Sequence, residues 1–381
     1  MTRRKNLGIY VHVPFCKQKC VYCDFYSLPR REGDMDAYTA ALEGQLARFS
    51  QAAADYDVTS VYFGGGTPSY LGPDRLRRLL RGVQAAFHVS YGAEITLEAN
   101  PDSAQDPEAL SALRRAGFNR ISLGMQSASG EELRAIGRIH TPAQVRSAVE
   151  AARKAGFDNL SLDLIYGLPG QGLPRWRENL AAAAELNPEH LSCYGLKAEP
   201  GTPLYARRET LPGDEDQAGM YLETVDFLEA RGYRQYEISN FAKPGRESRH
   251  NLKYWTLEEY LGFGPGAHSD FQGRRFAWAR DLEDYLSGFP TRGEEQVLSR
   301  RDRAEEYLML RLRLTRGLHP DHFEGMFGLD FSPFVPFLKR CEAAGYAVRQ
   351  AGAWRLTPQG FLVSNQIIGE LLSLLPPIPN S

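Results

Sequence analysis

Short apolar runs rich in β-branched residues alternate with longer segments of helical periodicity through the first two thirds of the chain. Runs of this kind, bounded by turn residues, are typical of buried strands. They predict strands at Leu7–Val13, Ser60–Phe63, Glu94–Ala99, Asn119–Leu123, Asn159–Leu164 and His190–Leu196. The segments between them predict helices at Asp36–Phe49, Pro73–Phe87, Asp106–Ala116, Thr141–Ala155 and Pro174–Leu186. Strict alternation of strand and helix favours a parallel α/β sheet with the helices outside it.

A short motif recurs where a predicted helix gives way to the next strand. Leu113–Phe118 and Ala152–Phe157 both contain a helix end, a glycine and an aromatic residue, and Glu229–Tyr233 repeats the motif more loosely. The glycine suits the position just past a helix, where the backbone turns left-handed and a Cβ atom is costly. Recurrence at about one strand–helix repeat favours a barrel or partial barrel over a two-layer fold.

The pattern changes after about residue 240. Residues 240–273 are rich in glycine, proline, aromatic residues and histidine and have little periodicity. Further on, the pattern predicts helices at Arg300–Leu314, Pro320–Phe327 and Phe334–Ala344, strands at Tyr346–Gln350 and Ala353–Leu356, and a last helix from Thr357. This order resembles a winged-helix module. Because it has no pronounced basic stripe for nucleic acid, we interpret it as a lid or a protein-contact element.

These patterns divide the chain into three predicted parts. Residues 1–240 form the α/β core, residues 241–298 complete its rim, and residues 299–376 form a mainly helical C-terminal module. The proline-rich tail around Pro376–Pro379 is predicted to be disordered.

Composition places the chain among ordinary soluble globular proteins, with 43% hydrophobic and 24% charged residues. A net charge of −2 gives no electrostatic argument for nucleic acid or for an anionic membrane surface. No apolar run approaches the roughly 20 residues that span a bilayer, so we expect a cytoplasmic protein without a transmembrane segment. Five cysteines, three of them clustered, fit a reducing compartment. Cys193 and Cys341 lie in apolar segments and are expected in the core.

The remaining three cysteines, Cys16, Cys20 and Cys23, directly follow the first predicted strand. Thiolates so close together are typical ligands of a metal or an iron–sulfur cluster. A [4Fe–4S] cluster usually takes four thiolates, so three leave one iron open to another ligand. Two alternatives are a zinc site, with His12 or a distant residue as fourth ligand, and a lipoprotein processing site. The bulky Phe15 argues against the second.

Polar and glycine residues stand at the ends of the other predicted strands. Gly64–Pro68 follows the second strand, Glu98 lies near the end of the third, Gln126 follows the fourth, and Asp163 closes the fifth. The carboxyl ends of parallel strands share one edge, so these groups are expected to meet the cysteines there. The glycines would let the backbone approach a zwitterionic amino-acid ligand, but they lack the ending of a phosphate-binding P-loop.

These motifs resemble the radical S-adenosylmethionine (SAM) superfamily, through Cys-x₃-Cys-x₂-Cys with Tyr22 and the following Gly-Gly-Gly-Thr-Pro. The resemblance implies a partial (β/α)₆ barrel. It also implies a [4Fe–4S] cluster on the three cysteines, with SAM bound to the open iron and cleaved on reduction to a 5′-deoxyadenosyl radical. An electron donor is then required.

A closer resemblance, to the oxygen-independent coproporphyrinogen III oxidase group, covers essentially the whole chain. It rests on Tyr10-Val-His-Val-Pro-Phe-Cys16, Gly-Gly-Gly-Thr-Pro-Ser69, Glu98-Ala-Asn-Pro101, Leu123-Gly-Met-Gln-Ser127, Gly137-Arg138-x-His140 and Asp163-Leu-Ile-Tyr-Gly-Leu-Pro169. The likeness implies a SAM site formed by Tyr10, Tyr22, Gly65, Gly66, Thr67, Glu98, Gln126, Arg138 and Asp163, with Lys197 and His268 as further candidates.

The chain departs from the oxidases at Phe25, where the resemblance expects a further cysteine, and in its short N-terminal region. Two other motifs, Tyr236–Ala242 and His250-Asn251-x-x-Tyr254-Trp255, resemble the HemW branch of haem chaperones. The likeness implies haem binding, with His250, Asn251, Tyr254 and Trp255 as candidates. Histidine is a common axial ligand of haem iron, and Tyr and Trp offer flat faces to a macrocycle.

The function that these resemblances favour is a haem chaperone, which passes haem to acceptor proteins such as membrane-associated respiratory enzymes. One alternative is a radical SAM enzyme of porphyrin biosynthesis that decarboxylates coproporphyrinogen III. Another is a simple iron–sulfur electron carrier, in which the SAM-site residues would have no role.

Overall fold

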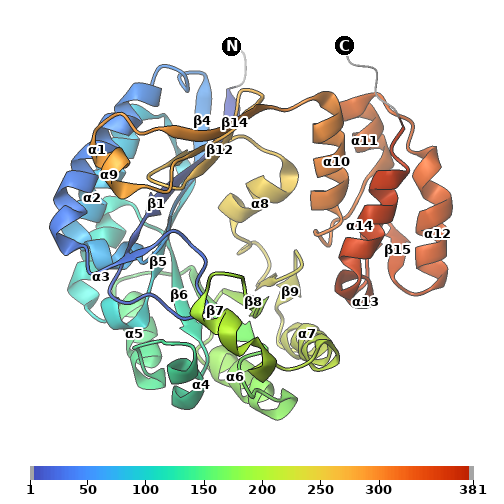
Figure 1. Cartoon of the computed structure of the whole chain (residues 1–381), viewed down its shortest axis with the longest axis horizontal. Coiled ribbons are helices and arrows are strands. Elements are labelled where there is room, and N and C mark those ends of the chain that lie inside the picture. Colours follow the sequence, from blue (N-terminus) through green and yellow to red (C-terminus); the bar gives the residue numbers. More distant parts are fainter. Residues whose placement is uncertain (1–3, 377–381) are drawn as a thin grey trace.

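The protein is described by a computed structural model over residues 4–376. Six parallel strands pair in the order of the sequence and form the body of the sheet (Figure 1). They are β1 (Lys5–Val13), β4 (Tyr56–Gly65), β5 (Val89–Ala99), β6 (Arg120–Gln126), β7 (Leu160–Tyr166) and β8 (His190–Gly195). Each overlaps a predicted strand, and β4 and β5 begin earlier than predicted. The predicted α/β class with a parallel sheet is therefore confirmed.

Helices cover the outer face of this sheet (Figure 1). The five predicted helices are found as α1 (Met35–Phe49), α2 (Pro73–Ala86), α3 (Pro107–Ala116), α5 (Pro142–Lys154) and α6 (Leu173–Glu185). Two further helices, α4 (Gly130–Ala135) and α7 (Asp214–Glu229), were not predicted. The glycines of the recurring motif, Gly117, Gly156 and Gly232, all have the positive φ expected just past a helix.

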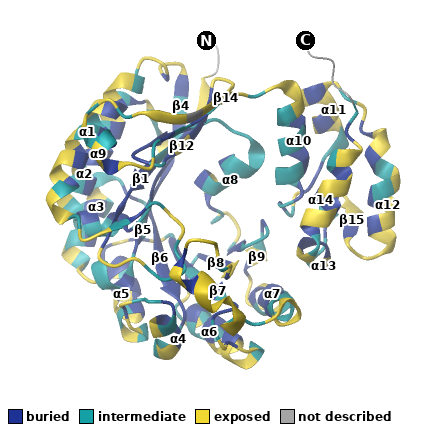
Figure 2. Cartoon of the chain, viewed as in Figure 1, coloured by how far each residue is buried: buried dark blue, intermediate teal, exposed yellow. Residues whose placement is uncertain are grey.

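The two faces of the parallel sheet differ in character. Leu7, Ile9 and Val11 alternate along β1 and are fully buried, and burial of each such side chain contributes roughly 1.5–3 kcal/mol. The intervening positions of neighbouring strands are paired, Gly8 with Ser60 and Tyr10 with Tyr62. The middle parts of the strands are thus mostly buried (Figure 2), yet one face is apolar and the other carries many polar groups.

The sheet continues beyond both ends of the six-stranded body. On one side β11 (Tyr260–Phe263) runs parallel to β1, followed by the antiparallel strands β12 (His268–Phe271), β13 (Arg274–Trp278) and β14 (Arg292–Val297), with α9 (Leu282–Leu286) between the last two. On the other side lie β10 (Asn240–Ala242) and β9 (Arg234–Gln235). Within residues 4–376 the resulting twelve-stranded order is open. No strand was predicted here, because these strands are short and two of them, β11 and β14, contain glycine.

Helix α8 (Arg249–Thr256) lies between the sheet and the C-terminal module (Figure 1). Its first turn is capped twice. The Ser248 hydroxyl accepts a hydrogen bond from the Asn251 amide at 3.4 Å. The buried carboxylate of Glu94 accepts from the amides of Arg249 and His250 at 3.1 and 3.0 Å. A carboxylate at a helix N-terminus satisfies free amide groups and the helix dipole, so Glu94 fixes α8 to the sheet.

The C-terminal module contains three helices, a hairpin and two short final helices. They are α10 (Arg300–Arg311), α11 (Pro320–Phe327), α12 (Val335–Ala343), β15 (Ala347–Gln350), β16 (Ala353–Leu356), α13 (Pro358–Leu362) and α14 (Ser364–Ser373). The predicted last helix is divided at Val363, whose backbone is not helical. Most of the tail predicted to be disordered lies outside the described residues. The division of the chain at residues 240 and 298 stays a prediction.

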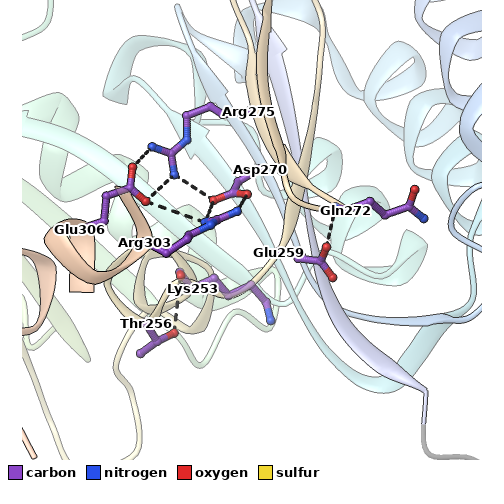
Figure 3. Close-up of polar contacts among 8 residues, drawn as sticks. All are labelled: Lys253, Thr256, Glu259, Asp270, Gln272, Arg275, Arg303 and Glu306. Carbon is purple, nitrogen blue, oxygen red and sulfur yellow. Dashed lines mark hydrogen bonds and ion pairs between the residues drawn. The ribbon is translucent and has the colours of Figure 1, made fainter. Parts of the chain in front are cut away.

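A cluster of four charged residues joins this module to the sheet (Figure 3). Asp270 on β12 is 3% exposed and accepts two hydrogen bonds from Arg303 on α10, each 2.5 Å long. Arg275 on β13 also donates to Asp270, at 2.8 Å, and contacts Glu306 on α10. The cluster balances two positive with two negative charges and leaves the buried carboxylate fully paired.

Among the described residues, no helix is both long and apolar enough to cross a membrane.

Candidate cluster and cofactor site

A cavity of about 400 Å³ lies at the carboxyl ends of the parallel strands. It gathers most of the residues predicted for the cluster and SAM: Cys16, Cys20, Cys23, Tyr22, Gly65, Gly66, Thr67, Glu98, Gln126, Arg138, Asp163 and Lys197. The residues come from loops and strand ends that are far apart in the sequence. The expected convergence at one edge of the sheet therefore occurs. The role of each residue stays a prediction.

The cysteine loop is closed at its base by a short parallel pair, β2 (Phe15–Cys16) with β3 (Leu28–Pro29). The Thr67 hydroxyl lies 3.5 Å from the Cys16 sulfur, and the Cys23 amide donates to the Cys20 carbonyl at 3.2 Å. Burial raises the pKa of the Cys16 and Cys20 thiols. Binding iron as thiolates would therefore release protons.

Among residues 4–376, no group of three or more His, Cys, Asp and Glu side chains is arranged to hold a metal ion. In a [4Fe–4S] cluster each cysteine binds a different iron atom, so its ligands lie further apart than those of one ion. Three thiols lining one cavity fit that donor set.

Two glycines form the wall of the cavity beside the cysteines. Gly65 has a φ of 109°, and a Cβ atom there would lie 2.6 Å from the ring of His12. A Cβ atom on Gly66 would lie 2.8 Å from the Phe15 carbonyl oxygen and 3.0 Å from the Cys16 sulfur. Only glycine fits at either position, so bare backbone faces the cluster loop.

A hydrogen-bonded chain runs along this wall from Arg138 to Thr67. The Arg138 guanidinium donates to the side-chain oxygen of Asn100 at 2.9 Å, and the side-chain nitrogen of Asn100 donates to the Thr67 hydroxyl at 3.1 Å. The Nε atom of Arg138 is buried and has no partner among the described residues. An unpaired buried donor is costly, and a ligand carboxylate would satisfy it.

Gln126 ends β6 with a φ of 61°, a left-handed conformation that is uncommon for residues with a side chain. A Cβ atom on Gly124 would lie 2.9 Å from the side-chain amide nitrogen of Gln126. The lack of a side chain at Gly124 therefore leaves space for Gln126. Strain of this kind persists where the surrounding structure holds it, often at functional sites.

Acidic side chains line the inner part of the cavity. Glu98 accepts a hydrogen bond from the Tyr62 hydroxyl at 2.6 Å and from the Gly65 amide at 3.2 Å. Burial raises the pKa of Glu98 to about 7, and it also raises the pKa of Asp163. The Ser122 hydroxyl lies 3.1 and 3.2 Å from the two Asp163 oxygens. These carboxyl groups suit the hydroxyl, amine and sulfonium groups of a nucleoside ligand.

Several lining residues were not predicted: Tyr62, Arg120, Ser122, Ser192 and Tyr194. Arg120 is 2% exposed, and its Nε atom has no partner in the described part of the chain. Most of these residues lie on the parallel strands, at positions that alternate with buried apolar ones. A polar residue in an otherwise apolar strand is the signal that could have found them.

Three further predicted residues, Tyr10, His12 and His268, do not line this cavity. The Tyr10 hydroxyl and the His12 Nδ1 atom are 3.1 Å apart, and His12 Nε2 lies 2.8 Å from the Tyr26 carbonyl oxygen. Both ring nitrogens of His12, the alternative zinc ligand, therefore have partners. Burial lowers the pKa of His12 to about 4. His268 begins β12 and is exposed.

The haem candidates lie on α8. His250 is 1% exposed, and its ring nitrogens lie 2.9 Å from the Ser60 hydroxyl and 2.8 Å from the Tyr254 hydroxyl. Burial lowers the pKa of His250 to about 3, so the imidazole is neutral, as a metal ligand must be. Trp255 is partly exposed, and Asn251 is the one of the four that lines the cavity. Ligation of iron by His250 would require one of its hydrogen bonds to break.

Two known protein families match separate parts of this chain. The sequence profile of the Radical SAM superfamily matches residues 10–182, and that of the HemN C-terminal domain matches residues 298–363. The chain is 37% identical to the heme chaperone HemW of Bacillus subtilis (strain 168), over 96% of this chain and 99% of that protein. It is also 37% identical to the heme chaperone HemW of Escherichia coli (strain K12), over 98% of this chain and all of that protein.

Among solved structures, the fold is similar to that of coproporphyrinogen III oxidase (HemN) from Escherichia coli, a radical SAM enzyme. The TM-score is 0.82 and the identity 25%, over 96% of this chain and 90% of that chain. The predicted partial radical SAM barrel is thus confirmed, and the superfamily implies a [4Fe–4S] cluster and SAM. Near-complete coverage of its HemW relatives places the chain in the HemW family of the radical SAM superfamily.

Proposed function

We propose that this protein is a cytoplasmic haem chaperone, which holds a [4Fe–4S] cluster and SAM in the cavity and passes haem to acceptor proteins. The observation that carries the proposal is the position of α8. This helix bears the His-Asn-x-x-Tyr-Trp motif of the predicted haem region and contributes Asn251 to the cavity. One haem candidate, Asn251, therefore lines the predicted SAM site, and the other three lie on the same helix.

Different residues of the cavity are expected to bind the cluster and the separate parts of SAM. Cys16, Cys20 and Cys23 would hold the cluster, which supplies an electron to SAM when both are bound. Arg138 has an unpaired buried nitrogen for the carboxylate of SAM. Glu98 offers an acceptor to its ribose hydroxyls or amine. The bare backbone at Gly65 and Gly66 leaves room for the methionine end.

Similarity to HemN over almost the whole chain favours a second candidate, oxidative decarboxylation of coproporphyrinogen III. Phe25 argues against it, because it occupies the place of the oxidases' further cysteine and is 68% exposed. A simple electron carrier would leave the glycine wall, Arg138 and Glu98 without a role. Incubation of the reduced protein with SAM and coproporphyrinogen III distinguishes the candidates, since a chaperone yields no vinyl product and an oxidase yields it with turnover.

Replacing His250 with alanine is expected to weaken haem binding by about tenfold or more and to shift the Soret band, because the axial nitrogen is lost. Haem titration followed by absorption measures both effects. His88→Ala is the control, since His88 is an exposed histidine that pairs with Asp57 and directly precedes β5, whose opposite end reaches the cavity. Unchanged affinity and spectrum in His250→Ala would reject this ligand and would leave the cluster assignment untouched.

Binding of SAM is expected to tighten as the pH rises through about 7. Burial raises the pKa of Glu98 to about 7, so its carboxyl group changes charge near neutrality. The ionised form accepts hydrogen bonds and attracts the sulfonium, whereas the protonated form does neither as well. Affinity should thus be lowest near about pH 6 and level off near about pH 8.

Calorimetric titration of the cluster-loaded protein with SAM across this pH range measures the effect. Glu98→Gln should bind weakly at every pH, with most of the pH dependence gone. If the variant keeps the pH profile of the wild type, another group is responsible and Glu98 is not the acceptor.

A further inference from the structure

Tyr62 connects the cavity to the helix that carries the haem candidates. Its side chain lines the cavity and its hydroxyl donates to Glu98 at 2.6 Å. On the side of α8, the ring of Tyr62 stacks on the ring of His250, with centroids 5.2 Å apart and an interplanar angle of 28°. One side chain therefore touches both a predicted SAM acceptor and the predicted axial ligand.

The surroundings of Tyr62 leave it little freedom. It is 9% exposed, and the ring of Tyr10 stacks on it at 6.2 Å with an angle of 27°. His250 is held in turn by Ser60 and Tyr254, and its amide is held by Glu94. In a packed interior of this kind, side chains move between discrete arrangements rather than by small adjustments.

We propose that Tyr62 is a positioning residue that couples the two ligands, so that SAM in the cavity opposes ligation of haem iron by His250. The inference rests on the proposed function and adds to it a link between its two sites. Neither the family resemblance nor the motifs of the chain assign a role to Tyr62.

The sign of the coupling between SAM and haem binding follows from what each ligand requires of these side chains. Haem ligation requires His250 to give up a ring hydrogen bond and to leave its stacked position on Tyr62. SAM would engage the Glu98 carboxylate and close the cavity around Tyr62, which stabilises the arrangement that holds His250 inside. Each ligand thus favours a different arrangement of the same side chains, and linkage makes their binding mutually unfavourable.

Haem affinity of the cluster-loaded protein, measured anaerobically with and without saturating SAM, tests the proposal. We expect haem to bind at least about fivefold more weakly when SAM is present, and SAM to lose the same factor when haem is present. In Tyr62→Phe the stacked ring remains and the bond to Glu98 is lost. The ratio of haem affinities without and with SAM, both measured in this variant, should then fall below about twofold.

Tyr285→Phe is the matched control, because it also removes a buried tyrosine hydroxyl, one that donates to Gln45 away from the cavity residues. It should retain the wild-type factor, and iron content confirms that each variant is assembled. If both ligands bind the wild type independently, or SAM tightens haem binding, the coupling is wrong and the proposed function stands. If Tyr62→Phe keeps the full factor, the role of Tyr62 is wrong. If the wild type binds no haem, the proposed function itself fails.

Discussion

Replacing Cys20 with alanine is expected to reduce the iron content of anaerobically reconstituted protein from about four atoms per chain to a small fraction of that. The loop would then offer only Cys16 and Cys23, and two thiolates leave two irons of the cluster without protein ligands. The broad absorption of the cluster and the EPR signal of its reduced form should disappear together. Binding of SAM should weaken as well, because its iron anchor is lost.

Cys341→Ala is the matched control for this experiment. Cys341 is buried in the C-terminal module and does not line the cavity, so the variant should assemble the cluster at the wild-type level. Parallel iron and sulfide analysis of the two variants separates a ligand from a cysteine that only packs. A complete four-iron spectrum in Cys20→Ala would mean that another residue supplies the third ligand.

Replacing Asp270 with asparagine is expected to lower the free energy of unfolding by about 3 kcal/mol. The amide keeps the shape of the side chain but removes the charge that pairs with Arg303 and Arg275 (Figure 3). Loss of one partner leaves the other charges of a buried cluster uncompensated. This expected loss of stability lies at the lower end of the range for a broken buried ion pair, because both arginine side chains keep some contact with solvent.

Urea unfolding measures the total loss, and hydrogen exchange of the α10 amides locates it at the junction between sheet and module. Glu305→Gln on the same helix is the control. It removes a partly exposed pair with Arg301 one helical turn away and should cost no more than about 0.5 kcal/mol. Equal losses in the two variants would show that the cluster contributes no more than a surface ion pair.

The sequence alone determined the parts of this protein that depend on local patterns. Alternating strands and helices specified the parallel sheet, and the recurring glycines marked where helices end. The cysteine loop and the residues Gly65, Glu98 and Gln126 stand at strand ends. Parallel strands end at one edge of a sheet, so their order along the chain was enough to predict that these residues meet.

Only the tertiary structure decided what lies on the polar face of the sheet and what covers it. Ser60 and His250 are 190 positions apart, and no local pattern predicts that their side chains form a hydrogen bond. The same is true of Asp270 and Arg303, which join two parts of the chain across a sheet edge. Strands β11 to β14 are too short to show a periodicity of their own, and they are stabilised by neighbours that come from distant segments.

The placement of His250 illustrates the difference most directly. Its motif identified a candidate ligand, but a motif carries no information about burial. In the folded protein the imidazole is fully enclosed and stacked on Tyr62, a residue of the cavity. Which residues can reach a ligand is set by how α8 packs between the sheet and α10, because long-range packing, unlike strand order, depends on side chains from several elements at once.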